Sequence, residues 1–176
     1  MLGLSFGLSC SMESPINQNT DQSVYFDIPS YFENEIAQRP WDSMRKTVEF
    51  NNQVEEYNPD QFDIYEELKE TLELQINKPA WIGKFKVDSI VNDKQQLEAV
   101  IYNTEEDNIA IKEVELLYDK GKDTPTTLRI LREQSSLIYQ RKQWITYNKG
   151  EEIEIKNESK SVRDSATQIL KINYLF

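Results

Sequence analysis

The feature of this sequence that most constrains its fold is an alternation of apolar and polar residues that begins after Trp81. Apolar side chains at every second position place one face of a strand in a core and leave the other face in water. Parallel strands would need crossover helices, and the links between these segments are too short to hold them. The pattern therefore predicts an antiparallel meander. The alternating segments are Phe85/Val87, Leu97/Ala99/Ile101, Val114/Leu116/Tyr118, Leu128/Ile130, Leu137/Tyr139, Ile145/Tyr147, Ile153/Ile155 and Leu170/Ile172/Tyr174/Phe176.

Turn-like sequences separate several of these segments. Asn, Asp and Gly tolerate the backbone angles that tight turns require, so clusters of them mark the joints of a meander. We therefore place turns at Asn92-Asp93-Lys94, Glu106-Asp107-Asn108, Lys120-Gly121-Lys122 and Asn148-Lys149-Gly150.

The first half of the chain predicts two helices. Ser30 and Glu33 have the spacing of a capping box, with Ser30 at the N-cap, and the helix that follows runs to about Arg39. It would place Phe32 and Ile36 on one apolar face.

A second helix is predicted to begin at Asn58, with Pro59 in its first turn, and to end at Asn77. Its apolar stripe consists of Phe62, Tyr65, Leu68, Leu72 and Ile76. Between the helices, residues 46–50 and 53–57 flank two asparagines and predict a tight hairpin. The expected fold class is α+β: an antiparallel meander sheet of about seven to ten strands, with two N-terminal helices packed on one face.

Charge and composition exclude several classes of function. The net charge is −11 and the basic residues are not clustered, so we expect no nucleic-acid partner. The sequence contains no His, the commonest metal ligand and general base. Its five glycines do not form a phosphate-binding loop. We therefore expect no cofactor, no metal site and no enzymatic activity.

Cys10, the only cysteine, follows a short apolar run and precedes a polar stretch. This pattern is typical of bacterial lipoprotein export signals, in which the thiol receives a diacylglyceryl group. No basic residue precedes the run, so we expect the true start codon to lie upstream of Met1. An ordinary chain end is the competing interpretation; we favour lipidation. Residues 1–9 are then a signal-peptide remnant, residues 10–23 a lipidated flexible tether, and residues 24–176 a single α+β domain.

Two segments of the sequence, with Lys46-Thr47-Val48 between them, resemble a family of uncharacterised envelope lipoproteins of Bacteroidota-type Gram-negative bacteria. One is the pattern FDIPxYFExEI that starts at Phe26, and the other is the INKPAW segment from Ile76 to Trp81. The resemblance extends over most of the chain, although its motifs lie in the first half. It implies a location in the cell envelope, anchored in a membrane on the periplasmic or outer-membrane side, and it implies no activity, cofactor or active site.

Aromatic and acidic residues supply the remaining candidate contacts. Trp41, Trp81 and Trp144 could stack on a carbohydrate, but packing in or beside the core is the favoured interpretation. Glu55-Glu56 and Glu66-Glu67 could supply two carboxylates for glycosidic cleavage, but adjacent residues diverge on a strand or a helix.

The predicted function is that of a lipid-anchored, non-enzymatic interaction or structural module that binds a protein partner in the envelope. The sheet face and the open edge strands are the expected contact surface, because an antiparallel edge accepts a further strand. Two alternatives remain. One is a carrier of a lipid or another hydrophobic ligand within a curled sheet. The other is a glycan-binding or glycan-processing protein.

Overall fold

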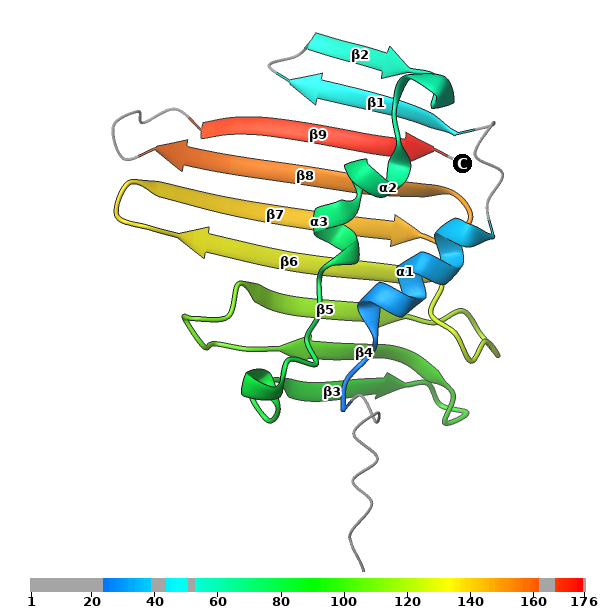
Figure 1. Ribbon diagram of the computed structural model, residues 1–176. Coiled ribbons are helices and arrows are strands. Elements are labelled where there is room, and N and C mark those ends of the chain that lie inside the picture. Colours follow the sequence, from blue (N-terminus) through cyan, green and yellow to red (C-terminus); the bar gives the residue numbers. More distant parts are fainter. Residues whose placement is uncertain (1–23, 39–43, 51–52, 162–166, 176) are drawn as a thin grey trace, which may run out of the picture.

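The computed structural model describes residues 24–38, 44–50, 53–161 and 167–175. The fold is α+β, as predicted: nine antiparallel strands form one unclosed sheet in the order β2-β1-β9-β8-β7-β6-β5-β4-β3, with the helices in front of one face (Figure 1). The elements, in chain order, are α1 (Ile28–Ala37), β1 (Arg45–Phe50), β2 (Gln53–Tyr57), the 3-10 turn η2 (Pro59–Gln61), α2 (Ile64–Glu67), α3 (Lys69–Leu72), the 3-10 turn η3 (Pro79–Trp81), β3 (Lys86–Val91), β4 (Leu97–Asn103), β5 (Ile111–Leu117), β6 (Thr127–Ser135), β7 (Tyr139–Asn148), β8 (Glu152–Ser161) and β9 (Thr167–Leu175).

The sheet consists of a meander and a hairpin. Strands β3 to β9 follow one another, each antiparallel to the next, and all four predicted turns lie between strands of this meander. The β1–β2 hairpin then extends the sheet beyond β9, because β1 pairs with β9 through partners such as Val48 and Ile172. The last strand of the chain is therefore an interior strand, held between β8 and β1.

Helix α1 starts earlier than the capping-box pattern predicts. Its N-cap is Asp27, whose Oδ1 accepts a hydrogen bond from the Ser30 amide at 3.2 Å. The Ser30 hydroxyl donates to the other oxygen of the same carboxylate at 2.9 Å, so Ser30 supports the cap instead of forming it. The predicted apolar face is confirmed, because Phe32 and Ile36 are both buried.

The single helix predicted over residues 58–77 is wrong. Phe62 has extended backbone angles, which end the first turn, and the Asp63 side chain accepts from the Tyr65 and Glu66 amides to start α2. A side chain that binds nearby amides in this way competes with continuous helix. Of the predicted stripe, Leu68 and Ile76 are fully buried, whereas Tyr65 is exposed.

Two strand predictions also need correction. In β4 the residues that face the core are Val100 and Tyr102, which pair with Leu116 and Val114, and not Leu97, Ala99 and Ile101. Residues 97–102 contain several consecutive apolar residues, so either register of alternation fits that segment. Leu137, predicted in a strand, lies in the turn between β6 and β7.

The core lies between the helices and the sheet face that they cover. It contains Phe32 and Ile36 of α1, Leu68 between α2 and α3, and inward side chains of strands β4 to β9. Glu35, the buried carboxylate of α1, accepts from the Tyr147 hydroxyl at 2.6 Å and pairs with Lys149 at 2.8 Å. These contacts fix α1 against the end of β7.

The two segments that carry the family resemblance lie side by side in the fold. The Asn77 side chain accepts from the Tyr25 amide at 2.7 Å and donates to the carbonyl oxygens of Tyr25 and Phe26 at 3.0 and 3.3 Å. The Tyr25 hydroxyl accepts from the Gly83 amide at 2.7 Å. One role of these motifs is therefore structural: they join the start of α1 to the segment that enters the sheet.

Within the described ranges, no helix combines the length and the apolar character needed to cross a bilayer.

Candidate functional site on the helix side of the sheet

A groove of about 500 Å³ lies between the α2–α3 segment and the inner face of β7, β8 and β9. Three kinds of side chain meet in it: an acidic wall from the helices, an apolar floor from the strands, and a polar cluster at one end of that floor. Its lining consists of Asp63, Glu66, Glu67, Glu70, Thr71, Arg141, Gln143, Ile155, Asn157, Leu170 and Ile172.

The floor of the groove is a continuous apolar strip that follows from the strand register. Ile172 of β9 lies between Ile155 of β8 and Val48 of β1 in one row across the sheet. In the next row, Leu170 pairs with Phe50 of β1. Phe50 keeps 40% of its surface exposed, so the strip reaches solvent at the margin of the groove.

The polar cluster is organised around one oxygen atom. Asn157 Oδ1 accepts from Arg141 Nε and Nη2 at 3.2 and 2.7 Å, and from Gln143 Nε2 at 2.8 Å. Gln143 is buried. Because buried polar groups are costly unless they are hydrogen-bonded, this convergence holds Arg141 and Gln143 in one arrangement.

Glu70 of α3 balances the charge of this cluster. Its Oε2 lies 3.6 Å from Arg132 Nη1 and 3.9 Å from Arg141 Nη1. The Glu70 side chain is mostly exposed, so these ion pairs are weak and readily exchanged for a ligand. The guanidinium groups of Arg132 and Arg141 are therefore positioned by the sheet but only loosely neutralised by the helix.

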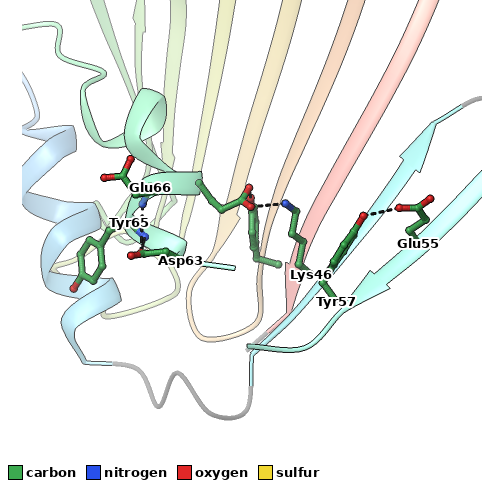
Figure 2. Close-up of polar contacts among 8 residues, drawn as sticks. Lys46, Glu55, Tyr57, Asp63, Tyr65 and Glu66 are labelled. Atoms are coloured by element: carbon green, nitrogen blue, oxygen red, sulfur yellow. Dashed lines mark hydrogen bonds and ion pairs between the residues drawn. The ribbon is translucent and has the colours of Figure 1, made fainter. Parts of the chain in front are cut away.

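The acidic wall is tied to the hairpin through Lys46 of β1. Glu67 Oε1 pairs with Lys46 Nζ at 2.6 Å, and Glu67 Oε2 accepts from the Tyr174 hydroxyl at 3.0 Å. Figure 2 shows Lys46 between the helical segment and Tyr57 of β2, whose ring centroid lies 5.3 Å from Lys46 Nζ. Burial, followed by the charge of Glu67 and its hydrogen bond, raises the pKa of Tyr174.

Tyr57 forms its own contact at the open edge strand. Its hydroxyl donates to Glu55 Oε2 at 2.5 Å (Figure 2). That hydrogen bond, with the charge of the same carboxylate, raises the pKa of Tyr57. Both groups of the pair lie on the exposed hairpin.

A second hollow of about 440 Å³ lies on the other side of Glu70, beside α3. It is lined by Trp81, Lys78 and Arg132, together with neighbouring residues. Lys78 Nζ lies 4.4 Å from the Trp81 ring centroid, and the ring also packs against the core. Glu70 thus separates two open hollows, and Arg132 lies in the second of them.

The structure separates the residues that the sequence proposes as a site. Cys10 and Trp41 lie outside the described residues. Trp81 is on the helix side, whereas Trp144 alternates with the inward Gln143 and Ile145 and so faces away from the helices. Lys142 and Lys156 lie 5.4 and 4.8 Å from the Trp144 ring centroid. The two described tryptophans therefore do not form one surface, and the glycan-contact hypothesis stays a prediction.

Sequence reasoning missed the polar cluster. Its signal is a change within the alternation, because the inward positions of β7 are apolar at Ile145 but polar at Gln143 and Arg141. The same change occurs in β8 between Ile155 and Asn157. Two adjacent strands that change at the same row indicate a polar patch on the inner face.

The positions of the carboxylates in the groove can be compared with those that glycosidic cleavage requires. These carboxylates all come from residues 63–70 and therefore form one wall, whereas glycosidic cleavage needs carboxylates on two sides of the scissile bond. Among the residues that the structure describes, no group of acidic, His or Cys side chains is arranged to hold a metal ion. Comparison with protein-family models, with curated proteins and with solved structures gives no match.

Proposed function

We propose that this protein is a lipid-anchored, non-enzymatic binding module of the cell envelope, and that the groove between α2–α3 and β7–β9 is its contact surface. The observation that carries the proposal is the polar cluster around Asn157 Oδ1, which is ordered within the fold yet borders an open groove. Hydrogen-bond donors that the fold already holds in place beside an apolar strip suit a recognition surface, because their side chains lose little conformational entropy when a partner binds.

The charges of the groove indicate the kind of partner it binds. Glu66 and Glu70 on the wall favour a basic group, whereas Arg141 favours a carboxylate or a carbonyl. The strip of Ile155, Ile172 and Leu170 favours an apolar segment between them. A peptide segment with both charges and an apolar centre fits this pattern, and it is consistent with a protein partner in the envelope.

Site-specific photo-crosslinking in native cells tests the contact surface. A photoreactive amino acid in place of Glu66, whose side chain is 75% exposed on the wall, should give a discrete crosslinked species. The matched control is Lys86, which is 72% exposed on the opposite edge strand β3. Crosslinking at Glu66 that disappears in an Arg141→Ala/Asn157→Ala background supports the proposal. Equal crosslinking at both positions, or none at Glu66, contradicts it.

The anchor requires a separate test. Labelling with an alkyne fatty acid should modify the wild-type protein at Cys10 and leave the Cys10→Ser variant unlabelled. The variant should also move from the membrane fraction to the soluble fraction. An unlabelled wild-type protein in its native cells would remove the lipid-anchored part of the proposal and leave the groove unaffected.

One observation favours a second candidate function, a carrier of a hydrophobic ligand. The apolar strip continues from Ile172 and Leu170 to the partly exposed Phe50, so an acyl chain could lie along β9 with its polar end at Arg141. Native mass spectrometry of protein purified from its host should then show a bound lipid that a Phe50→Asp variant lacks. A bare polypeptide mass argues for the peptide-binding proposal.

A further inference from the structure

Exposed apolar side chains gather at one end of the sheet. At this end β6 ends and β7 begins, β8 ends and β9 begins, and β1 ends and β2 begins; the helices lie away from it (Figure 1). Among the described residues of these strand ends and of the β6–β7 turn, six large apolar residues keep at least 40% of their surface exposed. They are Leu137 (95%), Ile138 (71%), Val54 (60%), Ile169 (41%), Phe50 (40%) and Tyr139 (40%).

Of the described residues at this end, the most exposed large apolar side chains belong to the β6–β7 hairpin. Its strands remain paired as far as Ser135 and Gln140, and Leu137 and Ile138 follow in the turn. β7 begins at Tyr139, four residues from Gln143 in the last buried row, or about 13 Å at the rise of a strand, and the turn lies beyond Tyr139. Two adjacent aliphatic side chains at this turn, 95% and 71% exposed, can contact a flat surface because the helices lie away from this end of the sheet.

The charge of this hairpin region differs from that of the whole chain. Residues 132–142 and 157–161 contain four basic and two acidic side chains, whereas the chain has a net charge of −11. Both acidic residues are paired, Glu133 with Lys142 at 2.7 Å and Glu158 with Lys156 at 2.8 Å. Glu70 also pairs with Arg132 and Arg141, so the region has four basic against three acidic side chains and lacks the negative excess with which the rest of the chain would repel an anionic surface.

Tyr139 lies at the boundary between the apolar turn and the basic strands. Tyrosine is favoured at the interface between hydrocarbon and water because its ring is apolar and its hydroxyl polar. An aliphatic tip, an aromatic residue and then basic residues, in that order along β7, match the order of acyl chains, interface and headgroups in a bilayer.

We propose that the β6–β7 turn inserts into the interface of an anionic lipid bilayer, with Leu137 and Ile138 among the acyl chains and Lys142 and Lys160 near the headgroups. This contact is independent of the groove and of Cys10. A protein anchored at Cys10 would thereby gain a second attachment that fixes its orientation relative to the membrane.

Vesicle flotation tests the proposal without the anchor. The full-length Cys10→Ser protein is mixed with vesicles of phosphatidylethanolamine and phosphatidylglycerol in equal parts. Leu137→Ser/Ile138→Ser should lower the bound fraction at least about tenfold, because two aliphatic side chains no longer leave water. The matched control is Val87→Ser/Ile90→Ser, which changes two half-exposed residues on the edge strand β3 and should bind as the parent does.

Tryptophan fluorescence tests directly whether the turn enters the bilayer. In the Cys10→Ser background, Ile138→Trp should add a fluorescence component that shifts to shorter wavelength on vesicles and is quenched by brominated acyl chains. Equal flotation of the parent and the Leu137→Ser/Ile138→Ser variant, or an added component of the Ile138→Trp variant that does not shift, overturns the proposal. Concentration-dependent self-association of the parent that the same double variant abolishes also overturns it, because the tip would then bind a second copy of the chain.

Discussion

Replacement of Glu35 by alanine should destabilise this protein far more than an ordinary surface substitution. Glu35 is buried under α1 and accepts from the Tyr147 hydroxyl at 2.6 Å and from Lys149 at 2.8 Å. A hydrogen bond to a charged group contributes about 1.5–3 kcal/mol. The Lys149 side chain is 35% exposed, so water screens its contribution to less than about 1 kcal/mol. We therefore expect Glu35→Ala to lower the free energy of unfolding by about 3 kcal/mol.

Urea denaturation followed by circular dichroism measures this loss. For a chain of this size the slope is about 2 kcal/mol per molar urea, so the midpoint should fall by about 1.5 M. Glu33→Ala is the matched control, since Glu33 is exposed on the same helix and its loss should cost less than about 0.5 kcal/mol. A second variant, Tyr147→Phe, isolates the shared hydrogen bond in a double-mutant cycle.

Two results would refute this reasoning. If Glu35→Ala and Glu33→Ala shift the midpoint equally, the contacts of Glu35 do not stabilise the fold. If the effects of Glu35→Ala and Tyr147→Phe simply add, the two side chains do not interact as the 2.6 Å distance requires.

Three further predictions concern stability. Phe32→Ala should cost about 3–5 kcal/mol, because the ring is fully buried, and urea midpoints should show a much smaller loss for the half-exposed Phe50→Ala. Asn77→Ala should lower stability by about 2 kcal/mol through its three backbone contacts, and hydrogen exchange should locate the loosened region at residues 25–26. The raised pKa of Tyr174 means that its neutral form stabilises the fold below pH 10, and that this contribution falls as pH rises above 10, where the unfolded tyrosine ionises. Tyr174→Phe should reduce the loss of stability between pH 10 and 11, measured by thermal unfolding, and an unchanged slope would contradict this.

The strands were predictable because their signal is local. Alternation at Ile145/Tyr147 and Ile153/Ile155 records which face of each strand is buried, and turn residues such as Gly121 and Gly150 have the positive φ that their positions require. The burial of Phe32 and Ile36 follows equally from their spacing on one helix face.

The parts that were mispredicted depend on competition between local and tertiary contacts. Asp63 disfavours a helix interior only weakly by propensity, but in the fold its side chain caps a new helix and divides the predicted one. The apolar run of β4 fits both faces, and only its pairing with β5 decides that Val100 and Tyr102 point inward. No feature of the sequence near β1 or β9 indicates that these two strands pair.

The groove was less predictable than the fold. Gln143 and Asn157 are 14 residues apart in sequence and meet only because β7 and β8 pair in one particular register. Their meeting could be inferred only after that register was known, since a shift of one residue would turn Asn157 to the opposite face. The contact of Glu67 with Lys46 likewise depends on how the helical segment crosses the sheet.

The position of β9 determines when this chain can finish folding. β1 is synthesised before β3 to β8, yet its second neighbour in the sheet is β9, so the paired side chains Glu49 and Lys171 are 122 residues apart in sequence. Until β9 is synthesised, β1 and β8 each present an unsatisfied edge that could join a neighbouring polypeptide. The sheet can therefore be completed only after β9 has been synthesised, and until then the nascent chain offers both edges to a holding chaperone.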